Sequence, residues 1–285
     1  MAVLTKSCLV GGQGIASGFR DAAALSWRLI ISCQSSGIDY ERLLRGWYLE
    51  RKQQFDISLA STVRNGDMVN SKNPFAIFVR DWGLWLLQMI PSCKRWLELG
   101  PRADNPMTYQ YADGMVFMPE LGGGISFAQT YCVELGSSSK DGKVHFTDDV
   151  IFGGSRTKLF QIVVLLNDAN QVESARDDLN GLDQLCPLLS TQEATYFVRR
   201  ESMCTPLPSD RASTHQVFRS ATAEEFANSH LCVNRPPPRG YREDHMWRCV
   251  ESKRYVIVRQ DRFVFAACST SRELERAAAR LIELL

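Results

Sequence analysis

The chain has 285 residues, which is enough for one large domain or two ordinary ones. Its hydrophobic content of 45% and charged content of 23% are typical of a soluble globular protein. The formal net charge is +1 and no block of like charges occurs, which argues against nucleic acid or a membrane surface as the main partner.

The first predicted element is a helix that follows the glycine-rich run Gly12-Gln13-Gly14-Ile15-Ala16-Ser17-Gly18. Glycines at a loop-to-helix junction let the backbone approach a ligand closely, because no Cβ intervenes. The first helical turn also offers unpaired N–H groups and the positive end of the helix dipole. This arrangement suits a phosphate, a carboxylate or the carbonyl edge of a flavin ring. Most such runs are nevertheless ordinary glycine-rich helix entries.

Three further helices are predicted before residue 105. Asp39 is expected to cap a helix from about Tyr40 to Val63, Asn73-Pro74 opens one that runs through Ile90, and Pro91 opens a short one to Leu99. The apolar run 82–90 is shorter than the roughly 20 residues of a bilayer span, so we expect a buried or partly exposed helix there. Because no strand precedes a Gly-x-Gly-x-x-Gly run, residues 1–105 cannot form a Rossmann domain.

From about residue 104 onward the pattern becomes mixed. The predicted elements are a strand at Leu159–Leu166, a helix from about Gln171 to Leu185, a strand at Thr195–Val198, a helix at Ala223–Ser229, a hairpin of Tyr255–Arg259 and Phe263–Ala267, and a helix from Glu273 to Leu285 capped by Ser271. This order is that of a thioredoxin-like domain. Disulfide chemistry would need Cys-x-x-Cys after the first strand, where the chain has Asn167-Asp168-Ala169-Asn170. We therefore reject a disulfide oxidoreductase.

Cysteines and histidines suggest no other chemistry. The nine cysteines are odd in number and none stand at Cys-x-x-Cys spacing, so we expect reduced, mostly buried thiols in a cytoplasmic protein. The four histidines show no metal-ligand spacing. We predict no metal site and assign no catalytic residue.

The longer string around the glycines resembles a known family. Residues 12–22, followed by Leu25-Ser26-Trp27-Arg28-Leu29, resemble the segment that closes the flavin site in FAD-dependent aromatic hydroxylases, a family that includes phenol hydroxylase and p-hydroxybenzoate hydroxylase. The resemblance implies that this helix points its N-terminus at the flavin pyrimidine carbonyl. The positions that would carry this role are Gly12, Gln13, Gly14, Ile15 and Ala16. Many relatives have Asn at the position of Ala16, which leaves the backbone N–H groups as the expected contact.

Two other segments extend the resemblance. Residues 47–52 resemble the family's helix behind the flavin helix, so Glu50 and Arg51 are expected to form surface or interhelix pairs. Residues 255–267 resemble the hairpin of the family's C-terminal thioredoxin-like domain, a packing and oligomer-contact module. The family's Gly-Asp-Ala-Ala-His-type stretch does not precede the glycine run. We therefore expect an N-terminally truncated α/β chain (α+β overall): residues 1–105 as the helical C-terminal part of a FAD-binding domain, then residues 106–285 as a thioredoxin-like domain.

The resemblance implies a monooxygenase that uses FAD, NAD(P)H and dioxygen to hydroxylate a phenolic or polyketide-like substrate. Degradation of aromatic compounds and secondary metabolism are both compatible with the family. The expected partners are a small aromatic substrate and either a second copy of the chain or a full-length homologue. The alternative is a non-catalytic dimerisation or regulatory module that lacks flavin chemistry. Without a Rossmann sheet to cover them, the N-terminal helices are expected to expose apolar patches.

Overall fold

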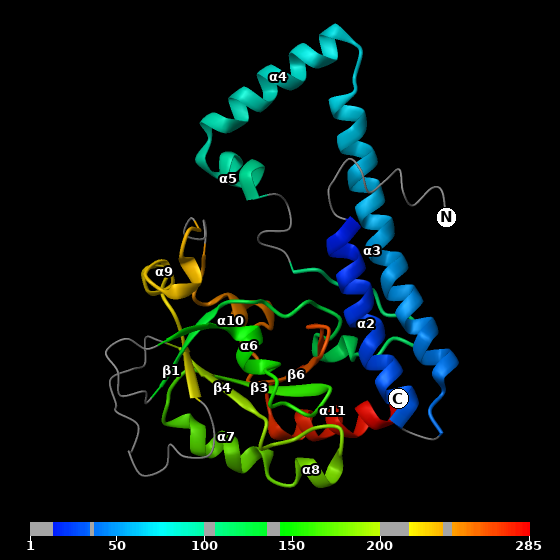
Figure 1. Cartoon of the computed structure of the whole chain (residues 1–285), viewed down its shortest axis with the longest axis vertical. Coiled ribbons are helices and arrows are strands. Elements are labelled where there is room, and N and C mark those ends of the chain that lie inside the picture. Colours follow the sequence, from blue (N-terminus) through cyan, green and yellow to red (C-terminus); the bar gives the residue numbers. More distant parts are fainter. Residues whose placement is uncertain (1–13, 35–36, 100–105, 136–142, 200–216, 236–240) are drawn as a thin grey trace. The chain divides into compact units, whose positions relative to one another are not determined.

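The computed structural model describes residues 14–34, 37–99, 106–135, 143–199, 217–235 and 241–285 (Figure 1). The chain divides into two compact units. The first comprises Met1–Ser36 and Tyr40–Met115, and the second comprises Gly37–Asp39 and Val116–Leu285.

The described elements of the first unit are largely helical. They are α2 (Gly14–Gln34), α3 (Tyr40–Val69), α4 (Pro74–Met89) and α5 (Pro91–Leu99), and α2 lies alongside α3 (Figure 1). The predicted helices that start at Pro74 and Pro91 are confirmed, and α3 continues past Val63 to Val69. Asn73 caps α4 by accepting hydrogen bonds from the Phe75 and Ala76 amides at 3.0 and 3.4 Å. This cap and the following proline explain why the helix starts there.

A close backbone contact fixes α3 against the chain near residue 114. A Cβ atom added at Gly46, in the second turn of α3, would stand 1.9 Å from the Gly114 carbonyl oxygen. Gly114 itself has φ +90°, a conformation that favours glycine. Arg42, one turn before Gly46, forms an ion pair with Asp113 at 3.2 Å. Glycine at position 46 is therefore required for this approach.

Helix α4 is apolar but has no buried residue. Its exposed large apolar side chains, together with its C-cap, are Phe75, Phe78, Val79, Trp82, Trp85, Leu86, Leu87, Met89 and Ile90. The expected partly exposed helix over residues 82–90 and the expected apolar surface on the N-terminal helices are both present. None of the described helices has the length and apolar character needed to cross a membrane.

The second unit is built on a seven-stranded mixed sheet. Its strands are β1 (Tyr131–Glu134), β2 (Val144–Phe146), β3 (Phe160–Leu166), β4 (Thr195–Val198), β5 (Val217–Ser220), β6 (Tyr255–Arg259) and β7 (Val264–Cys268). The spatial order is β2-β1-β5-β4-β3-β6-β7. The pairs β3–β4 and β4–β5 are parallel, and the other four pairs are antiparallel. The predicted α/β class is thereby confirmed at the level of a mixed sheet with helices.

Helices cover both faces of this sheet. The described helical elements are the 3₁₀ turns η1 (Pro119–Leu121) and η3 (His230–Cys232), and the helices α6 (Thr147–Ile151), α7 (Gln171–Leu179), α8 (Leu182–Leu185), α9 (Ala223–Ala227), α10 (His245–Cys249) and α11 (Ser271–Leu284). In Figure 1, α6 and α10 lie on one face, and α7, α8 and α11 lie on the other. Val163 and Leu165 of β3 join the core on the α6 and α10 face. The alternate residues Ile162 and Val164 point to the other face, and all of β3 is buried.

Several local predictions differ from the structure. The helix expected from Gln171 to Leu185 is broken at Asn180 and Gly181, because Gly181 adopts φ +84° and ends the helical path. The cap of the last helix is Thr270 rather than Ser271, since the Thr270 hydroxyl accepts from the Glu273 amide at 3.2 Å. The apolar face of α11 was otherwise predicted, with Leu284 buried in place of Leu285.

Residues 118–127 cover the edge of the sheet at β7. The Met118 and Gly124 amides donate to carbonyls of β7 at 2.8 Å each, and the Phe127 amide donates to the Arg262 carbonyl at 2.7 Å. This coverage satisfies backbone groups that an exposed edge strand would leave unpaired.

Glu193 fastens the loop before β4 to the loop before β3. Its carboxylate accepts from the Thr157 amide at 2.9 Å, the Thr157 hydroxyl at 2.6 Å, the Lys158 amide at 3.2 Å and the Gln161 side chain at 3.1 Å. Burial alone would raise the pKa of Glu193, but these hydrogen bonds outweigh it and lower the pKa to about 2.

Candidate functional site

The candidate site is the N-terminal end of α2. Helix α2 begins at Gly14, so Gly14, Ile15 and Ala16 form its first turn, while Gly12 and Gln13 lie outside the described residues. The first turn carries no acidic side chain. The N–H groups of a first turn have no partners within the helix and stand at the positive end of its dipole. This end of α2 can therefore bind an electron-rich group.

Apolar side chains stand beside this helix end. Ile15 and Phe19 are one turn apart on α2, and they are 77% and 74% exposed.

Arg51 of α3 ties down the first two turns of α2. Its Nη2 donates to the Ser17 hydroxyl at 3.2 Å, and its Nε forms an ion pair with the Asp21 carboxylate. Trp47, one turn earlier on α3, donates its indole N–H to the Asp21 carbonyl at 3.4 Å. The Arg51 side chain is only 11% exposed. These contacts fix the start of α2 relative to α3.

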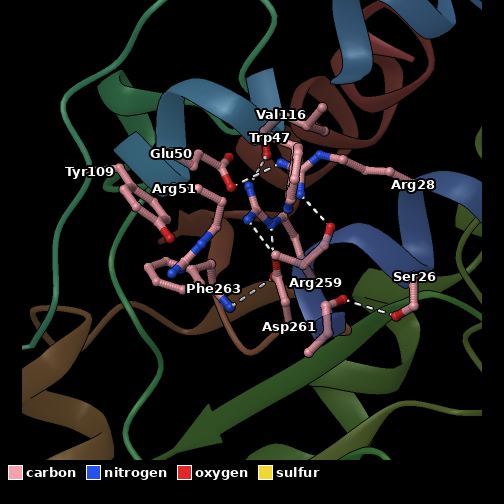
Figure 2. A network of polar contacts seen from close by, with 12 residues as sticks. Ser26, Arg28, Trp47, Glu50, Arg51, Tyr109, Val116, Arg259, Asp261 and Phe263 are labelled. Carbon is pink, nitrogen blue, oxygen red and sulfur yellow. Dashed lines mark hydrogen bonds and ion pairs between the residues drawn. The ribbon is translucent and has the colours of Figure 1, made fainter. Parts of the chain in front are cut away.

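A second ion pair joins the same two helices further along α2. Arg28 Nη2 lies 2.9 Å from Glu50 Oε2, and both side chains are fully buried (Figure 2). Arg28 Nη1 also donates to the Ala24 carbonyl at 2.6 Å. Glu50 and Arg51 thus both form the interhelix pairs that the sequence suggested as one of two options.

The extended segment 107–110 is attached to α3 at two successive residues. Gln54 Nε2 donates to Tyr109 Oη at 2.6 Å, and Gln54 Oε1 accepts from Arg51 Nη1. Gln53 exchanges two hydrogen bonds with the Gln110 backbone at 2.8 and 2.9 Å. Arg51 is therefore also held by Gln54, which is itself hydrogen-bonded to Tyr109.

The second unit contains its own buried ion pair. Arg259 Nε and Nη2 bind Asp261 at 2.9 and 2.6 Å, and Arg259 Nη1 donates to the Val116 carbonyl at 3.2 Å (Figure 2). Both side chains are buried. The bidentate pair stabilises the turn between β6 and β7, where Arg262 has φ +70°. Its role is structural.

Burial accounts for the raised pKa values of several groups in the second unit. Burial raises the pKa of Asp148 to about 6, and the carboxylate pairs with Arg262 at 2.8 Å. Burial likewise raises the pKa of the Cys249 thiol to about 11 and of the Cys268 thiol to about 12. These two thiols stay protonated near neutral pH, so they are poor nucleophiles. Within the described part of the chain, no group of three His, Cys, Asp or Glu side chains could hold a metal ion.

Comparison with known proteins points toward aromatic hydroxylases. The chain is 30% identical over 144 residues to 3-(3-hydroxy-phenyl)propionate/3-hydroxycinnamic acid hydroxylase of Mycobacterium sp. (strain JLS). It is 29% identical over the same length to the proteins of that name from strains KMS and MCS. Each alignment covers 50% of this chain and 24% of the relative, so the match spans about a quarter of the relatives' length. No protein-family model and no solved structure matches the chain. The chain thus has distant relatives among the aromatic hydroxylases.

The helix is predictable from the sequence, but the residues that hold it are not. The predicted site residues were Gly12 to Ala16, of which Gly12 and Gln13 lie outside the described residues. The contacts of Arg51 with Ser17 and of Glu50 with Arg28 were not predicted. One signal was available: Arg28 is the only charged residue between Ala22 and Cys33, and a charge within such an apolar run indicates a buried partner.

Proposed function

We propose that this chain is the flavin-contacting and C-terminal part of a FAD-dependent aromatic monooxygenase, which uses NAD(P)H and dioxygen to hydroxylate a phenolic ring. The observation that carries the proposal is the exposed N-terminal end of α2, which begins within the glycine run and lacks acidic residues in its first turn. The named function of the distant relatives supports it.

The residues present suit one part of FAD. Backbone N–H groups at Gly12 to Ala16 would bind the pyrimidine carbonyl edge, where negative charge develops when the flavin is reduced. Ile15 and Phe19 would supply apolar surface beside the ring. When bound, the flavin supplies the transfer of electrons from NAD(P)H and the activation of dioxygen.

The domain organisation that we propose is the one that the resemblance to FAD-dependent aromatic hydroxylases implies. Residues 1–105 would be the helical C-terminal part of a FAD-binding domain, and residues 106–285 a thioredoxin-like domain. The neighbouring strands β4-β3-β6-β7 support the second assignment. Strands β3 and β4 are parallel, β6 runs antiparallel to β3 and forms a hairpin with β7, and α11 follows. A cytoplasmic location is part of the same proposal.

The names of the relatives suggest the class of substrate. They denote hydroxylases of 3-(3-hydroxyphenyl)propionate and 3-hydroxycinnamic acid, which are phenols that carry a carboxylate. We propose a phenol as the substrate of the protein to which this chain contributes, and we assign no substrate-binding residue. A second candidate is a non-catalytic module that docks on a larger hydroxylase or on a second copy. The exposed apolar side chains of α4 favour it, because such surface is usually covered by a partner.

Titration of the purified chain with FAD, followed by flavin absorbance and fluorescence, tests the proposal. The wild-type chain should perturb the flavin spectrum, and Gly14→Asp should weaken binding. Aspartate there would occupy the first-turn N–H groups and bring negative charge to the flavin carbonyl. Asn70→Asp, which adds the same charge at an exposed residue after α3, is the matched control. If the wild-type chain leaves the flavin spectrum unchanged, the non-catalytic module becomes the better description.

A further inference from the structure

We propose that Arg51 is the positioning residue of the α2 site: from α3 it holds the first two turns of α2 in place and thereby sets where the N-terminal amides stand. The functional consequence rests on the proposed flavin contact. The structural part concerns only α2, α3 and the segment 107–110, which belong to one compact unit.

A single guanidinium contacts two successive turns of α2. Ser17 and Asp21 are four residues apart and therefore lie on the same face of the helix. Arg51 donates to the Ser17 hydroxyl at 3.2 Å and pairs with the Asp21 carboxylate through separate nitrogens. The planar guanidinium holds these two groups in a fixed relative geometry, which the single ammonium of lysine cannot do.

A further contact within α3 fixes the orientation of the Arg51 side chain. Its Nη1 donates to Gln54 Oε1, one turn along α3. The amide group of Gln54 in turn donates to Tyr109 Oη at 2.6 Å and contacts Met107 Sδ. Gln54 is buried at 6% exposure. The guanidinium is therefore held in one position. Through Gln54 it also links α2 to the segment 107–110.

The start of α2 depends on tertiary contacts for its order. The N–H groups of a first turn have no partners within the helix, so a first turn frays unless a contact from outside the helix holds it. If the amides of residues 14–16 are to meet a ligand in a fixed geometry, a tertiary contact must order them. Arg51 supplies that contact.

The charge arrangement is consistent with this role. A positive side chain beside the N-terminal turn is unfavourable by itself, because it opposes the helix dipole. Asp21 offsets the charge of Arg51 from the second turn, so the start of the helix is held without a net electrostatic penalty. The first turn itself stays free of acidic side chains, which would repel an electron-rich ligand.

Hydrogen exchange of the full chain, measured without flavin, tests the positioning role. In Arg51→Gln, the amides of residues 18–21, which donate to carbonyls one turn earlier in α2, should exchange at least about tenfold faster, because the contacts of Arg51 with Ser17 and Asp21 are lost. The amides of residues 24–34, held by the Arg28–Glu50 pair, should change by less than about twofold because that pair is untouched. Arg51→Lys keeps the charge and should restore little of the protection. Lys52→Gln, at the next position of α3, breaks only the exposed pair with Asp56 and should change neither segment.

A FAD titration of the same variants tests the functional consequence. Arg51→Gln and Arg51→Lys should weaken binding by about tenfold, in line with the loss of order in the first turn. Equal exchange along the whole of α2, or no change in Arg51→Gln, would overturn the positioning role. Faster exchange with unchanged FAD affinity would overturn the link to the ligand. If the wild-type chain binds no FAD, the proposed function fails, while the exchange data still decide the role of Arg51.

Discussion

The stability of the first unit should depend strongly on the buried ion pair between Arg28 and Glu50. Glu50→Gln keeps the size of the side chain but removes its charge, which leaves a buried guanidinium without this carboxylate. Breaking a buried pair by removing one partner typically costs about 3–5 kcal/mol. Domains are stable by about 5–15 kcal/mol, so this loss is a large fraction of the total.

The double variant separates the cost of removing one partner from the net contribution of the pair to stability. Replacing Arg28 by Met and Glu50 by Leu together removes both charges and fills a similar volume. Such replacements are often neutral or stabilising by about 1–4 kcal/mol. The double variant should therefore be more stable than Glu50→Gln alone. Lys52→Gln is the exposed control, because its pair with Asp56 is about half exposed on both sides and such pairs contribute little to stability.

Urea unfolding followed by circular dichroism at the helix band, with hydrogen exchange of the α2 and α3 amides, measures these effects. Exchange is needed because two units can unfold separately, and it reports the stability of the helix pair itself. Two results would contradict this prediction. Glu50→Gln could lower the free energy of unfolding by less than about 1 kcal/mol, or the double variant could be as unstable as the single one.

Three further predictions follow from local geometry. Gly46→Ala should destabilise α3 by about 1–3 kcal/mol or more, because its Cβ would clash with the Gly114 backbone. Gly66→Ala has open space around it and should stabilise the same helix by about 0.5–1 kcal/mol. Thermal unfolding measures both changes. Glu193→Gln should lower the free energy of unfolding above pH 4.5, and its deficit relative to wild type should shrink as the pH falls toward 2; a pH-independent deficit would contradict this. Thr270→Ala should cost about 1 kcal/mol and Ser271→Ala much less, because Thr270 is the cap of α11, and equal losses in urea titrations would show otherwise.

Elements whose signals are local are predictable from the sequence alone. Apolar periodicity, the Asn73-Pro74 start and the long apolar run at residues 159–166 each predict their element without help from the rest of the chain. The same holds for the hairpin that ends in β7 and for α11. The glycine run likewise marks the start of α2, because it is a property of consecutive residues.

The short strands β1 and β5, and the residues that hold the candidate site, depend on tertiary packing. Strands β1 and β5 have four residues each, and they exist because they pair with each other and with their neighbours in the sheet. Arg51 is 34 residues from Ser17 and 30 from Asp21 in the chain, and nothing in their local sequence signals that they meet. Such contacts depend on how α2 packs on α3. Side-chain pairing across elements is fixed by packing geometry, whereas helix and strand formation is largely written in local periodicity.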